Sequence, residues 1–177
     1  GFLAVTRVVP VVEWKVEVQT PGLFSCYDDT RLLELVREAK NQCDYLIVFP
    51  HWGVEREEIP EDYQAAIAER CIEAGADVIV GAHSHCLQSV EYIQGKPVFY
   101  SLGNFIFGYA IERTAYLKIT VDGQGSPLYQ LIPAFSSGGI TQLAGAKDAA
   151  RTIGRLNEIS QTAGIAEDGT VCPHISQ

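Results

Sequence analysis

The sequence predicts an α/β fold in which a parallel β-sheet is followed along the chain by antiparallel hairpins. In the first half, amphipathic helical segments alternate with short apolar runs, which favours parallel strands joined by right-handed crossovers. In the second half, turn-forming residues separate the apolar runs, which is typical of hairpins. Hydrophobic residues make up 47% of the 177 residues, enough apolar material for one globular core.

The first half supplies the parallel elements. In chain order we expect one or two strands at 2–12, a helix at 28–40, a strand at 44–52, a helix at 61–74 and a strand at 76–83. Asp29 or Thr30 can cap the first helix, and Gly75 suits the left-handed end of the second. The continuous apolar character of the runs at 44–52 and 76–83 indicates strands that are buried on both faces.

The second half supplies the antiparallel elements. We expect a hairpin at 89–102 turning at Gly95, a hairpin at 114–135 turning at Asp122–Gly123, a break at 136–139 and a helix at 146–162. Residues from Gly164 onward show no periodicity and are expected to form a tail. The predicted organisation is therefore one domain over 1–163 and a tail over 164–177.

Composition excludes several classes of protein. The chain has 13 basic and 22 acidic residues, a formal net charge of −9, and no Lys/Arg cluster, which argues against nucleic acid as a partner. No apolar run approaches the ~18 residues of a membrane span. The five cysteines lie at irregular spacings without a C-x-x-C motif, so we expect free and mostly buried thiols. The chain lacks Met and starts with Gly, so we expect it to be a processed or truncated piece.

Three of the four histidines follow two neighbouring predicted strands. His51 comes directly after the first apolar run, and His83 and His85 come after the second. If these strands are parallel neighbours, all three imidazoles emerge at the same carboxyl edge of the sheet, where ligand sites of open α/β sheets lie. Imidazole binds Zn, Mn and Fe, so the pattern predicts a divalent metal site. Glu55 lies four residues after His51 and could face the same pocket.

Each histidine motif has a simpler interpretation when taken alone. His51, next to Trp52, is of the kind that usually packs or caps, and an H-x-H pair is a weak signal. Cys86 follows His85, but adjacent side chains rarely face one another, so a Cys/His nucleophile pair is disfavoured. We expect His174 to be an exposed tail residue.

Three segments then carry a family resemblance: HWGVE at 51–55, GADVIVGAHSHCLQSVE at 75–91 and GKPVFYSLGNFIF at 95–107. They resemble the CapA-type family of bacterial poly-γ-glutamate capsule-synthesis proteins, within the calcineurin-like metallophosphatase superfamily. The resemblance covers about residues 1–145. It implies a metallophosphatase-like α/β/β/α sandwich with metal ions at the sheet edge, and metal-ligand roles for His51, His83 and His85. Asn104, in the SLGNF segment, is expected to be structural or to line the site.

The chain departs from the superfamily pattern upstream of His51. An early Asp at a strand end, a bridging Asp and an Asn-His element have no counterpart there. The chain therefore resembles only the later portion of such a domain and is expected to lack its N-terminal half. The three histidines suffice for one metal ion, with solvent completing its coordination.

Three functional interpretations remain open. The chain is the metal-binding part of a metal-dependent phosphoesterase-like hydrolase, a non-catalytic scaffold or polymer-binding module in capsule assembly or export, or an α/β domain whose histidines only pack and cap. The resemblance implies an anionic substrate or poly-γ-glutamate as partner, and a cell-surface location. It also implies that the missing N-terminal segment, or another chain, completes the site.

Overall fold

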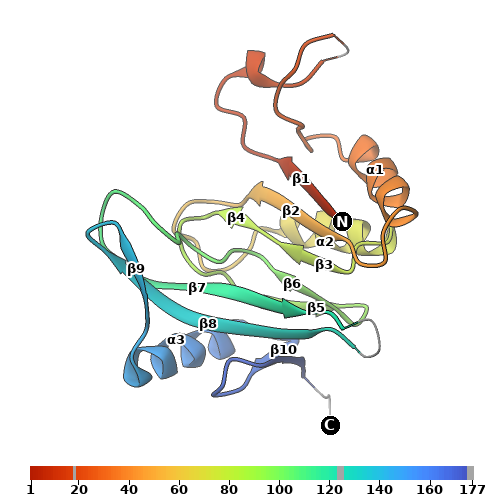
Figure 1. The fold of residues 1–177 in the computed structure, drawn as a ribbon. Coiled ribbons are helices and arrows are strands. Elements are labelled where there is room, and N and C mark those ends of the chain that lie inside the picture. Colours follow the sequence, from red (N-terminus) through yellow and green to blue (C-terminus); the bar gives the residue numbers. More distant parts are fainter. Residues whose placement is uncertain (18, 123–125, 175–177) are drawn as a thin grey trace.

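A mixed β-sheet lies at the centre of the computed structural model, which describes residues 1–17, 19–122 and 126–174 (Figure 1). The helices are η1 (Val12–Trp14, a 3₁₀ turn), α1 (Thr30–Lys40), α2 (Asp62–Glu73) and α3 (Ala146–Ile159). The strands are β1 (Phe2–Thr6), β2 (Ile47–Trp52), β3 (Val78–Val80), β4 (Ala82–His83), β5 (Val90–Ile93), β6 (Lys96–Phe99), β7 (Ile111–Thr120), β8 (Leu128–Ser137), β9 (Ile140–Leu143), β10 (Ala163–Ile165) and β11 (Val171–Pro173).

The central sheet has the strand order β1-β2-β3-β6-β5, and the short β4 also pairs with β2. Strands β1, β2, β3 and β6 run parallel to one another, whereas β5 is antiparallel to β6. A second sheet, β7-β8-β9, is entirely antiparallel. This combination of parallel and antiparallel strands with helices confirms the predicted fold class.

Helices α1 and α2 cover one face of the central sheet. Leu32 of α1 and Ile67 of α2 pack with Val48 and Ile79 of the sheet in one buried cluster, as the apolar stripes predicted. Gly75 has φ +119 at the end of α2 and confirms the predicted left-handed cap.

The start of α1 differs in detail from the prediction. Asp29 stands at the N-cap position, but its side chain makes no capping hydrogen bond and pairs with Arg70 of α2 instead. The backbone N–H of Thr30 donates to Asp28 Oδ1, at 2.9 Å. Asp28 therefore accepts a hydrogen bond at the helix start in place of the predicted cap Asp29, because the ion pair to α2 holds the Asp29 carboxylate away from the helix end.

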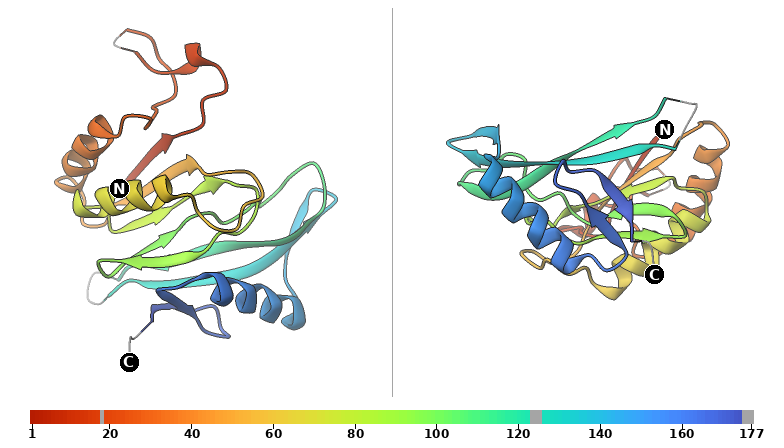
Figure 2. Two further views of the ribbon diagram at one scale, coloured as in Figure 1. Left: turned by 180° about the vertical axis from the view of Figure 1, so that it is seen from behind. Right: turned by 90° about the horizontal axis from the view of Figure 1, so that it is seen from below.

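The β7-β8-β9 sheet covers the other face of the central sheet (Figure 2). Val80 and Phe99 pack there against Leu131 of β8 and Leu156 of α3. Helix α3 closes the end of this core beside edge strand β5, where the Val90 N–H donates to Ser160 Oγ at 2.9 Å. The two sheets and three long helices thus enclose two apolar cores, one on each side of the central sheet.

Within the described residues, the segment 164–174 is structured, contrary to the expected tail. β10 and β11 form an antiparallel hairpin, and the side chains of Ile165 and Val171 are buried in the core with α3. Strands of three residues are too short to show an alternating pattern, which is why the sequence did not reveal them.

Other elements agree with expectation only in part. The segment at 2–12 contains one strand, β1, which is one of the two alternatives predicted, and Pro10 has no N–H to donate to a longer ladder. The strand predicted at 76–83 is split at Gly81, where a Cβ would lie 2.1 Å from the Tyr100 carbonyl oxygen. Gly138 and Gly139, both with positive φ, turn the chain into the unexpected strand β9. The 89–102 hairpin turns at Gly95 as predicted, and Gly123 of the other predicted turn lies outside the described residues.

All five cysteines are free thiols, as expected. Two are buried, two are half-buried and only Cys172 is exposed. Among the described residues, no helix is both long and apolar enough to cross a membrane.

A buried carboxylate joins the start of the central strands to α1. Asp77 Oδ2 accepts hydrogen bonds from Lys40 Nζ at 2.7 Å and from the Leu46 N–H at 2.8 Å, and Oδ1 accepts one from Lys96 Nζ at 3.0 Å. Burial alone would raise the pKa of Asp77, but these hydrogen bonds hold it below its ordinary value.

We expect Asp77→Asn to lower the free energy of unfolding at pH 7 by about 2–3 kcal/mol, because it weakens hydrogen bonds to charged groups. The folded-state pKa is depressed, so this contribution is complete above the unfolded-state pKa of about 3.9 and is lost as the pH falls through the folded-state value. Urea unfolding of both proteins should therefore show a difference at pH 7 that shrinks at pH 3. The exposed Asp44→Asn is the control, and an equal difference at both pH values would contradict the account.

Candidate metal centre

Parallel pairing brings the three histidines to one edge of the central sheet. His51 of β2 lies opposite Ala82 of β4, and Trp52 lies opposite His83. The imidazole centroids of His51 and His83 are 4.6 Å apart, and those of His83 and His85 are 5.9 Å apart. The convergence of residues about 30 positions apart in the sequence is therefore confirmed.

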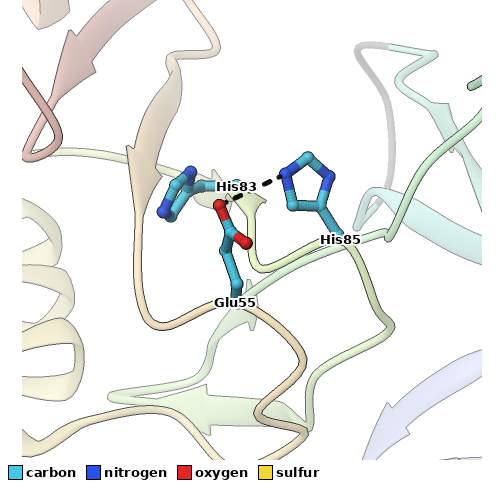
Figure 3. Close-up of side chains that lie close together, drawn as sticks. All are labelled: Glu55, His83 and His85. Atoms are coloured by element: carbon cyan, nitrogen blue, oxygen red, sulfur yellow. Dashed lines mark ion pairs between the residues drawn. The ribbon is translucent and has the colours of Figure 1, made fainter. Parts of the chain in front are cut away.

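The tightest group of donor atoms includes a carboxylate. Glu55, His83 and His85 each offer one ligand atom, and these three atoms lie within 4.8 Å of one another (Figure 3). Glu55 Oε1 is 3.8 Å from His85 Nε2. Glu55, which was predicted only to line the pocket, thus belongs to this group of three donor residues. His51 lies next to the group, because its ring contacts that of His83.

The backbone of this loop is held in an unusual conformation. His83 has φ +106 and His85 has φ +59, values that residues with a Cβ rarely adopt. Each such residue costs on the order of 1–3 kcal/mol and needs firm support from its surroundings. Ser84, fully buried between them, supplies it: its carbonyl oxygen accepts from the Arg56 N–H at 2.7 Å, and its hydroxyl donates to the Cys86 carbonyl oxygen at 2.9 Å.

Trp52 supports the same strand ends from the core of the protein. Its side chain is completely buried, and its indole N–H donates to the Tyr100 carbonyl oxygen at 2.9 Å. Gly81 lets the chain pass this contact, since a Cβ there would also lie 2.4 Å from Trp52 Nε1. The alternation of buried Trp52 with outward-facing His51 explains how one strand both fills the core and presents a candidate ligand.

Asn104 fixes the orientation of His85. Its Oδ1 lies 2.7 Å from His85 Nδ1, which leaves the Nε2 lone pair of His85 directed toward Glu55. Metal-binding histidines typically donate the second ring N–H to an oxygen in this way. The Asn104 amide nitrogen is buried and has no hydrogen-bond partner within the described residues. Asn104 therefore lies where the sequence placed it, beside the site, and in direct contact with a candidate ligand.

Two of the imidazoles are held in the form that binds metals. Desolvation lowers the pKa of His51, and the neighbouring His83 and His85 lower it further. Desolvation also lowers the pKa of His83, against the opposing effect of Glu55. His51 and His83 therefore keep a free lone pair at neutral pH, as a metal ligand requires. The donor set of His83, His85 and Glu55, with His51 beside it, fits Zn, Mn or Fe.

Sequence reasoning missed an aromatic neighbour of the site. Phe107 packs edge-on against His85, with centroids 5.1 Å apart, although no local signal marked it.

The Cys86 thiol donates to the Glu57 carbonyl oxygen, and burial raises its pKa, so it shows no sign of a nucleophile paired with His85. His174 is exposed, as expected, and its ring contacts the Gln161 carbonyl oxygen.

We expect His83→Ala to abolish stoichiometric binding of Mn²⁺, Fe²⁺ or Zn²⁺, because it removes the central imidazole of the cluster. Metal content after loading and desalting measures this. His83→Gly should lose metal equally while folding at least as stably as His83→Ala, because φ +106 favours glycine. His174→Ala is the matched control, and a His83 variant that keeps its full metal content would refute the assignment.

We expect Asn104→Ala to weaken metal affinity by roughly 10–100-fold, the usual effect of removing the partner that orients a ligating histidine. Competition with a chelating dye measures the affinity. Asn104→Asp, which keeps an acceptor oxygen for His85 Nδ1, should restore most of it. Equal affinities for the wild type and Asn104→Ala would show that the contact does not orient a ligand.

Comparison with known proteins agrees with the motifs at this site. Residues 5–109 match the model of the family described as "Bacterial capsule synthesis protein PGA_cap". The PGA biosynthesis protein CapA of Bacillus subtilis (strain 168) is 36% identical over 117 residues, which is 64% of this chain and 30% of the relative. The capsule biosynthesis protein CapA of Bacillus anthracis is 35% identical over 122 residues, 65% of this chain and 29% of the relative.

A more distant relative aligns over a longer part of the chain. A probable polyglutamine synthesis accessory protein of Mycobacterium tuberculosis (strain CDC 1551 / Oshkosh) is 26% identical over 169 residues, 86% of this chain and 44% of the relative. The chain thus spans about 30% of the length of the Bacillus relatives that it matches. Because the family match covers more than half of the chain and includes all of the candidate ligands, the chain belongs to the bacterial capsule synthesis protein family PGA_cap.

Proposed function

We propose that this chain carries the metal-binding part of a hydrolytic centre that acts in poly-γ-glutamate capsule synthesis. The observation that carries the proposal is the cluster of Glu55, His83 and His85 donor atoms at the carboxyl edge of the central sheet. The names of the Bacillus relatives support the process, and the donor set supports a divalent ion. The bond we expect to be cleaved is a phosphoester, with an amide of the polymer as the other candidate.

The residues of this chain have separate roles in such a centre. A divalent ion, when bound, polarises the scissile group and lowers the pKa of water. His83, His85 and Glu55 would hold it, and Asn104 would keep His85 in the tautomer that offers Nε2. His51, held neutral by desolvation, would extend the donor set from β2.

We further propose that another part of the longer protein completes this centre. β1 is the edge of the central sheet, and Phe2 at its start is 82% exposed. Beside it an apolar groove of about 340 Å³ lies between the two sheets, lined by Phe2, Phe49 and Leu117 among others. A segment of chain that docks at this edge would cover the groove and could bring further ligands. The capsule role of the relatives also supports a cell-surface location.

A second candidate is a non-catalytic module that binds the polymer during assembly or export. The specific observation in its favour is that the described residues place only one carboxylate, Glu55, in the cluster. A two-metal hydrolytic centre needs more ligands than these, unless the rest of the protein supplies them.

The test is hydrolysis by the full-length protein, with bis-p-nitrophenyl phosphate and poly-γ-glutamate as substrates and added Mn²⁺. We expect activity that is lost on chelation and falls at least 100-fold in His83→Ala, because this variant removes the central imidazole of the cluster. A 100-fold loss corresponds to about 2.7 kcal/mol of transition-state stabilisation. His51→Ala should also be impaired, and His174→Ala should not. Metal-dependent binding of poly-γ-glutamate without hydrolysis of either substrate would favour the second candidate. Activity that survives in His83→Ala would contradict the proposal.

A further inference from the structure

A cavity of about 250 Å³ opens beside the candidate metal centre, and His85 and Asn104 form part of its wall. The remaining wall comes from the loops after β2 and β4, from β7 with the two residues before it, and from α3. Its charged lining residues are three arginines and two glutamates: Arg56, Arg113, Arg155, Glu58 and Glu112. The lining is therefore net cationic in a protein whose formal net charge is −9.

Glu58 lies close to two of the arginines, Arg155 and Arg113. Its Oε2 accepts hydrogen bonds from Arg155 Nε at 2.9 Å and from Arg155 Nη2 at 2.7 Å. Arg113 Nη2 lies 3.7 Å from Glu58 Oε1, which is beyond a normal hydrogen bond. Arg155 is thus satisfied by Glu58, whereas the guanidinium of Arg113 is positioned by it and keeps donors for a ligand.

Arg56 has no ion-pair partner within residues 1–17, 19–122 and 126–174. Its backbone is nevertheless fixed, because its N–H donates to the carbonyl oxygen of the buried Ser84 at 2.7 Å. Arg56 also directly follows Glu55 of the metal cluster. A cation with a held backbone and a free side chain thus lies between the candidate metal centre and the cavity.

Apolar side chains make up a further part of the lining, beside the less polar Cys86, Tyr109 and Thr152. Leu87, Ile111 and Leu156 contribute side chains to the wall. A cavity that combines apolar walls with unshared guanidinium groups suits a short aliphatic segment that carries an anionic group beside it. Its volume is below the ~300–1,000 Å³ of pockets for drug-sized ligands, so it suits one small unit of a longer molecule.

We propose that this cavity binds a carboxylate of the substrate, next to the group held at the metal centre, with Arg56 and Arg113 as its partners. This rests on the proposed function and names its substrate class: a chain of γ-linked glutamate, in which every residue carries a free α-carboxylate. The planar guanidinium fork matches a carboxylate and makes strong charge-assisted hydrogen bonds to it. The cavity therefore selects for the acidic polymer over an uncharged amide polymer.

The test compares two probes on the metal-loaded full chain: a fluorescent γ-linked tetraglutamate and its α-carboxamide analogue. We expect Arg56→Gln combined with Arg113→Gln to weaken tetraglutamate binding at least tenfold in an anisotropy titration. The same double variant should leave the already weak binding of the carboxamide analogue unchanged. Arg56→Gln alone should give part of the effect, and it removes no ion pair of the fold. Arg37→Gln, an exposed arginine on α1, is the control and should bind as the wild type does.

The inference is overturned if the carboxamide analogue binds as tightly as the acid, or if the double variant keeps wild-type affinity. It is also overturned if inorganic phosphate displaces a phosphodiester probe from the cavity while the tetraglutamate does not bind. Metal content is measured in every variant and should not change. Loss of metal and hydrolysis in His83→Ala with unaltered binding in the arginine variants would leave the proposed function standing without this inference. Arginine-dependent binding of the tetraglutamate by a protein that takes up no metal would support this inference and contradict the proposed function.

Discussion

The parallel pairing of β2 with β3 and β4 is the constraint on which the rest of the site depends. It places His51 opposite Ala82, so residues far apart in the sequence share one sheet edge. Helices α1 and α2 bury one face of these strands. On the other face the second sheet buries β3, whereas Phe49 of β2 lines the open groove and is 40% exposed. The histidines therefore stand on a rigid support, which is what a metal centre requires of its scaffold.

The backbone of the ligand loop is costly, and the structure supports it locally. Two residues with a Cβ, His83 and His85, have positive φ, and the fully buried Ser84 between them is held by the backbone of Arg56. The same hydrogen bond therefore supports the candidate metal ligands and holds the backbone of Arg56, whose side chain lines the cavity. Metal binding and recognition of an acidic substrate would in this way share one structural element.

The sequence was informative wherever long-range periodicity or strand ends governed the structure. The two helices, the positions of the parallel strands and the convergence of His51, His83 and His85 followed from apolar spacing and the topology of parallel sheets. The prediction that the run at 44–52 is buried on both faces was wrong, because Phe49 faces the open groove and is 40% exposed. Elements of three or four residues, such as β9 and the β10–β11 hairpin, were missed because they are stabilised by tertiary packing. Arg113 and the contact of Asn104 with His85 could not be predicted, because both depend on how distant segments pack together.

The central claim is that one divalent ion binds to imidazole and carboxylate groups at this sheet edge. X-ray absorption spectroscopy of the zinc-loaded protein tests it most directly. The account predicts a coordination sphere of nitrogen and oxygen atoms only, with imidazole nitrogens at about 2.0–2.1 Å whose scattering contribution falls in His85→Ala. A sulfur neighbour at about 2.3 Å, or a spectrum that does not change in His85→Ala, would place the ion elsewhere and contradict the account.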